Sequence, residues 1–335
     1  MLTIKDIAKL AKCSPSTVSK ALNNKFDVSE KTRAKILKIA EKHNFHLHKI
    51  EQVNHKTENI GIVFCREEKP LSGNPFYSRV LEGIEAELAI NNYNLILTLL
   101  AEPFNGQVPK MIKEHKVDGL IIVGAMEDEF IDILKNYKFP TVFVDPSDYN
   151  LGYQKVIIDN EQGGYLATRH IIEKGHKKIA FVSGSLERAS FSLRFEGFKK
   201  AMAFFNIPVK SKYVKTGGLE NGYEFVLELL RMEDRPTAIF FGNDANALLG
   251  YKAVNDLGLK VPEDISIVGF DDIAMAKFSD PPLSTVMVYK EEIGSIAVRK
   301  LLNQIVHGQD GIPVTTMMPV KFIERESVWD LKKSK

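Results

Sequence analysis

Two short helical patterns with almost no chain between them open this 335-residue sequence. In the first, apolar residues recur at the spacing of one helix face: Ile4, Ile7, Ala8 and Ala11. The second begins at Ser14, a suitable N-cap residue, with Pro15 at the first helical position. Its apolar stripe consists of Val18, Ala21 and Leu22. Helix, tight turn and helix form the layout of the helix-turn-helix motif, whose second helix lies in the major groove of DNA.

The outward face of the second helix carries small, hydroxylic, amide or basic side chains. These are Pro15, Ser16, Thr17, Ser19, Lys20 and Asn23. Such side chains can approach base edges and phosphates without steric obstruction. The alternative is the solvated face of an ordinary three-helix bundle. A third helix is expected after Ser29, another suitable N-cap, and would close the bundle.

Charge separates a basic head from an acidic body. Residues 1–56 carry twelve Lys and Arg against five Asp and Glu, a net +7 within a total of +2, which leaves −5 for the rest. A positively charged N-terminal segment attracts the negatively charged phosphates of DNA. No apolar run reaches the roughly 18 residues of a membrane span, and no signal-peptide pattern opens the chain, so we expect a cytoplasmic protein.

Residues 47–58 are polar, have no clear period and are expected to form a linker. Four of the eight histidines lie in or near this segment: His43, His46, His48 and His55. A metal site or a pH sensor is one alternative there, but a solvated linker fixes no ligand geometry, so we expect no metal and no cofactor. Cys13 and Cys65 lie in separate segments and provide neither a disulfide framework nor a metal knuckle.

From residue 59 onward, apolar strands alternate with helices. Strands are expected at 60–64, 95–100, 119–123, 141–145, 156–159, 178–183, 213–216, 238–242 and 265–270. Helices are expected at 76–91, 107–115, 127–137, 161–174, 192–205 and 244–257. This order predicts parallel sheets covered on both faces, and two such sets predict two doubly wound subdomains. Ligands bind at the carboxyl ends of strands in such sheets, so we expect a ligand cleft between the subdomains.

Specific sequence blocks resemble a known family. T-I-K-D-I-A-K-L-A-K-C-S-P-S-T-V-S-K-A-L-N-N at 3–24, followed by V-S-E-K-T-R-A-K-I, is similar to the DNA-binding headpiece of the LacI/GalR bacterial transcription regulators. Lys12 stands where the family usually has glycine in the turn. N-P-F-Y-S-R-V-L-E-G-I-E at 74–85 and P-E-D-I-S-I-V-G-F-D-D at 262–272 are among the blocks that resemble the family's effector domain. The likeness spans about residues 2–326.

The resemblance implies an all-α helix-turn-helix headpiece followed by a periplasmic-binding-protein-like α/β domain of two doubly wound parallel-sheet subdomains. The expected bounds are 1–46 for the headpiece, 47–58 for the hinge or linker, and 59–335 for the effector-binding and dimerisation domain. Within that domain the N-subdomain would comprise 59–157 and 286–318, and the C-subdomain 158–285 and 319–335. A homodimer would bind a pseudo-palindromic double-stranded operator, because symmetric half-sites multiply specificity.

On this basis Pro15, Ser16 and Lys20 are expected to contact base edges. The residues expected mainly at phosphates are Thr3, Ser14, Thr17, Ser19 and Asn23. The family's hinge helix usually wedges an apolar residue into the minor groove. Here its usual proline and A-R-x-L signature are missing, and only Ile50 and Val53 could serve as the wedge.

The effector candidates follow predicted strands. Carboxylates or amides at Asp145, Asn243 and Asp271 can bond to sugar hydroxyls, and Arg194 supplies a forked donor. The apolar or stacking wall would come from Phe76 and Tyr77. By resemblance, Arg194, Asp271, Asp145 and Asn243 match effector-contacting positions, with Arg188 and Leu219 as weaker candidates and Phe191 as core or pocket. The alternative is that strand-end Asp and Asn cap the next helix, which Asp244 and Asp272 fit well.

The sequence therefore predicts a DNA-binding transcription regulator, expected to be a repressor, controlled by a small molecule. A sugar or sugar phosphate is the first expectation, and a purine, a nucleoside or a partner-protein co-repressor is the alternative. An enzyme is not expected, because the chain lacks GxGxxG after a strand, a P-loop, GxSxG and HExxH. A periplasmic-type sugar-binding protein would share the body but would not carry a basic helix-turn-helix.

Overall fold

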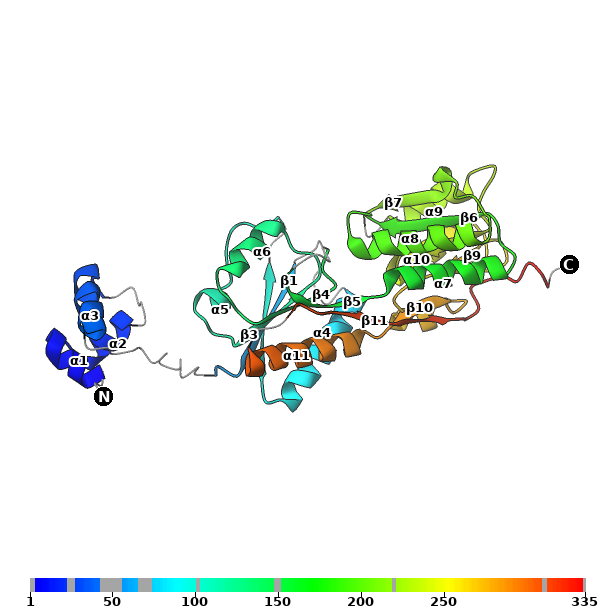
Figure 1. Cartoon of the computed structure of the whole chain (residues 1–335). Helices are drawn as coiled ribbons and strands as arrows, with labels where there is room; N and C mark the ends of the chain where they lie inside the picture. The colour runs from blue at the N-terminus through cyan, green and yellow to red at the C-terminus, as the bar shows by residue number, and fades with distance from the viewer. Residues whose placement is uncertain are drawn as a thin grey trace. The chain divides into compact units, whose positions relative to one another are not determined.

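The computed structural model describes residues 4–22, 28–42, 56–65, 74–100, 103–147, 152–218, 221–308 and 312–333. The chain divides into two compact units, Met1–Thr57 and Glu58–Lys335, coloured from blue to red along the chain in Figure 1. Within the described ranges, no helix has both the length and the apolar character needed to cross a membrane.

Three helices make up the described part of the first unit: α1 (Ile4–Ala11), α2 (Pro15–Leu22) and α3 (Glu30–Lys42). Their shared core consists of Ile7, Ala8, Ala11, Val18, Ala21, Val28, Ile36 and Ala40, with Cys13 and Ile39 packed against it. The predicted N-caps are confirmed, since the Ser14 hydroxyl accepts from the Thr17 amide at 3.0 Å and that of Ser29 from the Thr32 amide at 3.3 Å.

Lys12 directly follows α1, begins the turn before α2 and lies in the left-handed region, with φ 54°. This conformation is easy for glycine and costs other residues about 1 kcal/mol or more. This backbone conformation explains why the family usually has glycine at this position. Lys12 adopts it at a cost in conformational free energy.

The second unit contains two lobes. Lobe 1 is built on a six-stranded parallel sheet in the order β11-β5-β4-β3-β1-β2. The strands are β1 (Asn59–Cys65), β2 (Asn94–Leu100), β3 (Gly119–Val123), β4 (Thr141–Val144), β5 (Gln154–Ile158) and β11 (Thr315–Met318). Helices α4 (Pro75–Ile90) and α11 (Lys290–His307) pack on one face, and α5 (Lys110–Lys113) and α6 (Asp128–Lys135) on the other.

Lobe 2 is built on a four-stranded parallel sheet in the order β7-β6-β8-β9. The strands are β6 (Ile179–Gly184), β7 (Val214–Gly217), β8 (Ala238–Phe241) and β9 (Ser266–Val268). Helices α7 (Asn160–Glu173) and α8 (Ala189–Phe204) cover one face, and α9 (Gly222–Leu230) and α10 (Asp244–Asp256) cover the other. Two short 3-10 helices, η2 (Ser211–Tyr213) and η3 (Ala274–Lys277), lie between these elements.

The chain passes from one lobe to the other after β5, after β10 (Thr285–Val288), and between β11 and β12 (Val320–Ile323). Strands β10 and β12 pair with each other in antiparallel register, Thr285 opposite Ile323. One apolar core cluster runs from α4 and α11 through this region to α7 and α8. The predicted fold class, an all-α headpiece with a two-lobed α/β body, is confirmed.

Candidate effector site

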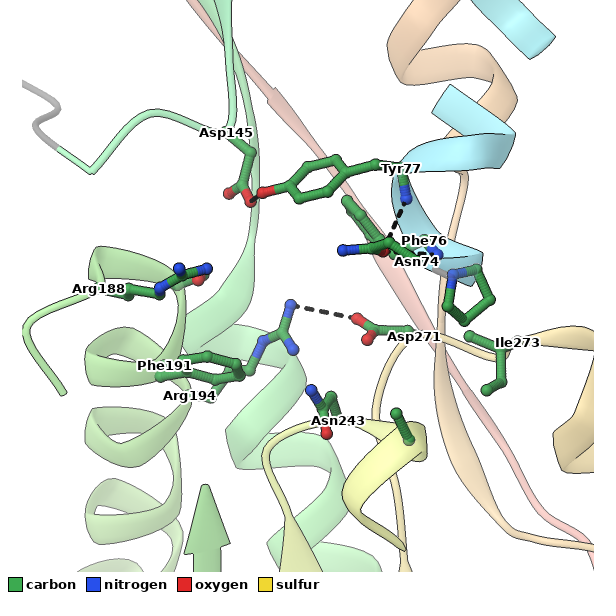
Figure 2. A pocket seen from close by; sticks show the side chains of 13 residues that line it. Asn74, Phe76, Tyr77, Asp145, Arg188, Phe191, Arg194, Asn243, Asp271 and Ile273 are labelled. Carbon is green, nitrogen blue, oxygen red and sulfur yellow. Dashed lines mark hydrogen bonds and ion pairs between the residues drawn. The ribbon is translucent and has the colours of Figure 1, made fainter. Parts of the chain in front are cut away.

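A cavity lies where the two lobes face each other (Figure 2), and residues that follow the carboxyl ends of β4, β8 and β9 line it. Lobe 1 supplies Asn74, Pro75, Phe76, Tyr77 and Asp145. Lobe 2 supplies Arg188, Ser190, Phe191, Arg194, Asn243, Ala245, Asp271 and Ile273. The empty space around these side chains, part of the open mouth included, is about 740 Å³.

The first turn of α4 provides the aromatic wall. Asn74 is its N-cap, and the Asn74 side-chain oxygen accepts from the amides of Phe76 and Tyr77, each at 3.1 Å. Pro75 occupies the first helical position, where its missing N–H costs nothing. The rings of Phe76 and Tyr77 meet edge to face with centroids 5.1 Å apart, and Phe64 packs against Tyr77 in the same manner at 5.9 Å. Such pairs fix the ring directions at the cavity edge.

Asp145 follows β4 in a left-handed conformation, with φ 49°. The Tyr77 hydroxyl donates to its Oδ2 at 3.3 Å, while its enclosed Oδ1 accepts no hydrogen bond from the described residues. Burial raises the pKa of Asp145 to about 6, against the opposing effects of the Arg194 charge and the Tyr77 bond. A ligand that donates a hydrogen bond to Oδ1 would satisfy this oxygen.

Arg194 is 4% exposed and extends from α8 toward the cavity floor. Its Nε donates to Asn160 Oδ1 at 2.8 Å and its Nη1 to the Gly242 carbonyl at 2.5 Å. The guanidinium also lies 3.7 Å from the centroid of the Phe270 ring. The backbone beneath it is tightly placed, because a Cβ at Gly164 of α7 would lie 2.1 Å from the Arg194 carbonyl oxygen. Arg194 is therefore held from several sides before any ligand arrives.

Asp271 lies beyond the end of β9 with φ 109° and is 7% exposed. Its Oδ1 is 3.2 Å from Arg194 Nη2, an ion pair drawn in Figure 2, yet this oxygen accepts no well-formed hydrogen bond from the described residues. Burial raises the pKa of Asp271, and the nearby Arg194 and Lys290 charges oppose that shift. Asp145 and Asp271, both with positive φ, thus each place at the site one carboxylate oxygen that lacks a well-formed hydrogen bond, and the Asp271 oxygen is ion-paired with Arg194. Such backbone strain is typical of functional sites.

The helix-cap hypothesis for Asp244 and Asp272 is wrong. It is Asn243 that caps α10, with its Oδ1 accepting from the Asn246 amide at 3.0 Å. The Asp244 carboxyl points instead to the Thr285 hydroxyl at 2.6 Å and the Ile273 amide at 2.9 Å. Asp272 pairs with Arg325 at 2.6 Å. Asn243 therefore combines capping with a place in the cavity wall, as Asn74 does in lobe 1.

Most effector candidates named from the sequence come together around this cavity. They are Phe76, Tyr77, Asp145, Arg188, Arg194, Asn243 and Asp271, joined by Phe191. Leu219 lies outside the described residues. That these side chains contact an effector stays a prediction.

Sequence reasoning missed part of the lining and also Asn160, which lies behind Arg194. The missed lining residues are Asn74, Pro75, Ser190, Ala245 and Ile273. Asn74 was detectable, since Asn followed by Pro is a helix-start signal ahead of Phe76 and Tyr77. Asn160 carries no such signal, because only the packing of α7 against α8 brings it to the guanidinium.

Among the DNA-contact candidates, Pro15, Ser16 and Lys20 are exposed on α2. The hydroxyls of Ser14 and Thr17 lie 2.8 Å apart, and Ser14 already serves as the cap. Thr3, Asn23 and Val53 lie outside the described residues. The same is true of Ile50 and of the four histidines near the linker. For Ser19 only the backbone is described. No group of three metal-ligating side chains occurs within the described ranges.

Comparison with known proteins matches both parts of the chain. Residues 3–47 match the family "Bacterial regulatory proteins, lacI family", and residues 168–328 match the "Periplasmic binding protein-like domain". The HTH-type transcriptional repressor PurR of Proteus mirabilis is 35% identical over 340 residues, covering 98% of each chain. The chain belongs to the LacI family of bacterial transcription regulators.

LacI-family relatives and structures agree on the class of protein. PurR of Photorhabdus laumondii is 34% identical, again over 98% of both chains. A regulator from Enterococcus faecium with bound ribose is 29% identical with TM-score 0.72, covering 82% of this chain and 99% of that one. The lac repressor dimer bound to operator, at 24% identity and TM-score 0.70 over 98% and 99% of the two chains, shares the fold. This LacI-family chain is a DNA-binding transcription repressor and not an enzyme, as the sequence predicts.

Proposed function

We propose that this repressor responds to a purine nucleobase bound between its lobes. The two relatives that are 35% and 34% identical over 98% of the chain are named PurR, which supports the alternative named from the sequence, a purine or nucleoside, over the first expectation of a sugar or sugar phosphate. The observation that carries the proposal is the pair of carboxylate oxygens without a well-formed hydrogen bond, Asp145 Oδ1 and the ion-paired Asp271 Oδ1, in a cavity that also has an aromatic wall.

The chemistry of a purine complements this arrangement. A flat bicyclic ring can stack against Phe76, Tyr77 or Phe191, and its N–H groups can donate to carboxylate oxygens. Its ring nitrogens and carbonyl oxygens can accept from the guanidiniums of Arg188 and Arg194. A neutral ring also spans the space between the lobes without bringing a charge into it.

A sugar phosphate fits less well. Two carboxylates face two guanidiniums in this cavity, so a dianion would enter a site with no surplus positive charge. A neutral pentose is the second candidate, favoured by the Enterococcus faecium regulator with bound ribose. Sugar hydroxyls can also donate to Asp145 and Asp271, but a pentose has no flat aromatic ring to stack against Phe76 or Tyr77.

At the DNA we propose that a homodimer reads a pseudo-palindromic operator, with the helix-turn-helix domain at 1–46, a linker at 47–58 and the effector-binding domain at 59–335. Exposed Pro15, Ser16 and Lys20 would contact base edges, and Thr3, Ser14, Thr17, Ser19 and Asn23 would mainly bind phosphates. A repressor of this kind acts in the cytoplasm, where the bacterial DNA lies.

A thermal-shift screen tests the effector class. Full-length protein is heated with adenine, guanine, hypoxanthine and xanthine, and in parallel with ribose and ribose 5-phosphate. A ligand that binds only the folded state raises the melting temperature by mass action, and about 3 kcal/mol is expected at 100 times Kd. We expect a concentration-dependent rise with at least one purine. A rise with ribose alone would favour the pentose, and no rise with any of the six would refute a small-molecule role for this cavity.

Operator reading is tested with Lys20→Ala in a gel-shift assay at fixed salt. Loss of a good base contact costs about 1–3 kcal/mol of discrimination, so preference for the operator over random duplex should fall at least fivefold. Lys38→Ala on α3 serves as the charge-matched control. An unchanged preference in Lys20→Ala would refute the base-contact role.

A further inference from the structure

The turn at Asp271 and Asp272 is strained and must be held by its surroundings. Both residues have positive φ, 109° and 50°. Such conformations cost of order 1–3 kcal/mol each and persist only where neighbouring groups determine them. Two further contacts connect the turn to β10: the Asp271 amide donates to the Val286 carbonyl at 2.8 Å, and Asp271 forms an isolated bridge with Met287.

Lys290 is the buried cation that supports this turn from behind. It is 5% exposed and is the first residue of α11. Its ammonium donates to the carbonyls of Asp271, Asp272 and Val288, the last two at 3.2 Å. An ammonium has three hydrogens, so one lysine satisfies both carbonyls of the strained turn and a third at the end of β10.

The contacts of α11 carry this connection into lobe 1. Helices α4 and α11 touch through their backbones, since a Cβ at Gly83 would lie 1.9 Å from the Glu291 carbonyl oxygen and one at Gly294 would lie 2.2 Å from that of Val80. The residue after Lys290 is therefore in backbone contact with α4. The first turn of α4 carries Phe76 and Tyr77.

A continuous set of contacts thus runs from one wall of the cavity to the other. It passes from the Asp271 turn to Lys290, along the start of α11, across to α4, and through Tyr77 to Asp145. Arg325, which follows β12, adds a second support for the turn through Asp272 and the Leu283 carbonyl at 2.7 Å. A close-packed path of this kind transmits a displacement instead of absorbing it.

We propose that Lys290 is a positioning residue that couples the ligand-facing turn of lobe 2 to the aromatic wall of lobe 1. A ligand that changes the Asp271 turn would thereby move the α4–α11 pair and with it lobe 1. The first strand of lobe 1, β1, directly follows the headpiece unit in the chain. The response to an effector rests on the proposed function, whereas the mechanical link between turn and helix is a property of the ligand-free protein.

Hydrogen exchange of the full chain without ligand tests that link. In Lys290→Met we expect at least tenfold faster exchange in peptides covering 269–274 and also in peptides covering 74–80. Lys300→Met is the matched control, because Lys300 lies on the same helix but contacts Gln154 instead of the turn. Control rates should equal those of the wild type. Unchanged exchange in Lys290→Met, or acceleration confined to 269–274, would overturn the proposal.

A second measurement reads out the effector response. Isothermal titration of a purine should give at least tenfold weaker binding in Lys290→Met than in Lys300→Met, which is within the usual range of coupling between sites. Unchanged affinity would contradict the positioning role. If the wild type binds no purine, the proposed effector fails while the exchange experiment still decides the role of Lys290. Should Lys290→Met not fold, Lys290→Gln retains two of the three N–H donors and should show the same exchange pattern with a smaller increase.

Discussion

Replacing Asp244 with asparagine should make the protein more stable at neutral and alkaline pH. Asp244 is fully buried, and burial together with the neighbouring Asp271 raises its pKa from 3.8 to about 8. The folded state therefore binds a proton that the unfolded state has lost anywhere between these two values. Stability from this group is complete below pH 4 and is lost as the pH rises toward 8.

The size of the effect follows from linkage. One proton bound only by the folded state lowers the free energy of unfolding by about 1.4 kcal/mol per pH unit. Asparagine does not titrate and can keep both neighbours, accepting from the Ile273 amide and donating to the Thr285 hydroxyl. The stability difference between Asp244→Asn and wild type should thus rise steadily from about pH 4 to pH 8 and then level off.

Urea unfolding at pH 5, 6, 7 and 8 measures this difference. The single tryptophan, Trp329, reports on lobe 2 because its backbone carbonyl bonds to His176 and its amide to Ser266. Asp132→Asn, at a carboxylate 70% exposed, provides the control and should show no such trend. A pH-independent difference between Asp244→Asn and wild type, or one that shrinks as the pH rises, would refute the assignment of a buried, proton-binding carboxyl.

Three further outcomes are expected. Lys12→Gly should stabilise the headpiece by about 1 kcal/mol by relieving its left-handed backbone, and a lower headpiece melting temperature by circular dichroism would contradict this. Gly83→Ala should destabilise the effector-binding domain by about 2 kcal/mol or more because the new Cβ would meet the Glu291 backbone. The control Gly152→Ala should be neutral because nothing lies within 4 Å of its Cβ position. Equal melting temperatures of the two variants would argue against the α4–α11 contact. Arg194→Ala should weaken purine binding roughly 100-fold in calorimetry and should retain operator binding. Arg299→Ala, at an exposed arginine, is the control. Undiminished purine binding in Arg194→Ala would refute this cavity as the purine site.

Much of the fold was predictable because its signals are local. The N-caps at Ser14 and Ser29, the buried Val and Ile runs of β3 and β4, and the helix start before Phe76 each occupy a few consecutive residues. Periodicity and capping rules detect such patterns in a single sequence. The helices expected at 76–91 and 244–257 accordingly agree with α4 and α10 to within one residue at each end.

The elements that were not predicted depend on distant partners. Helix α11 did carry a signal in the sequence, since Ile293, Ala297, Val298 and Leu301 are buried along one face. Strands β10, β11 and β12 have only four residues each, and they are defined by their pairing with other strands. Helix α9 was also missed. The same holds for the site: Asp145 and Asp271 were recognisable at strand ends, whereas Asn160 and Lys290 enter it only through tertiary packing.

The most direct test of the account is the affinity of the full-length protein for DNA, measured by fluorescence anisotropy at one fixed salt concentration with and without purine. Specific binding should exceed binding to random duplex by at least about a thousandfold, and a saturating purine should change the operator affinity by at least fivefold. Equal affinity for operator and random duplex, in the presence and absence of every purine, would contradict the central claim that a ligand held between the lobes controls DNA reading.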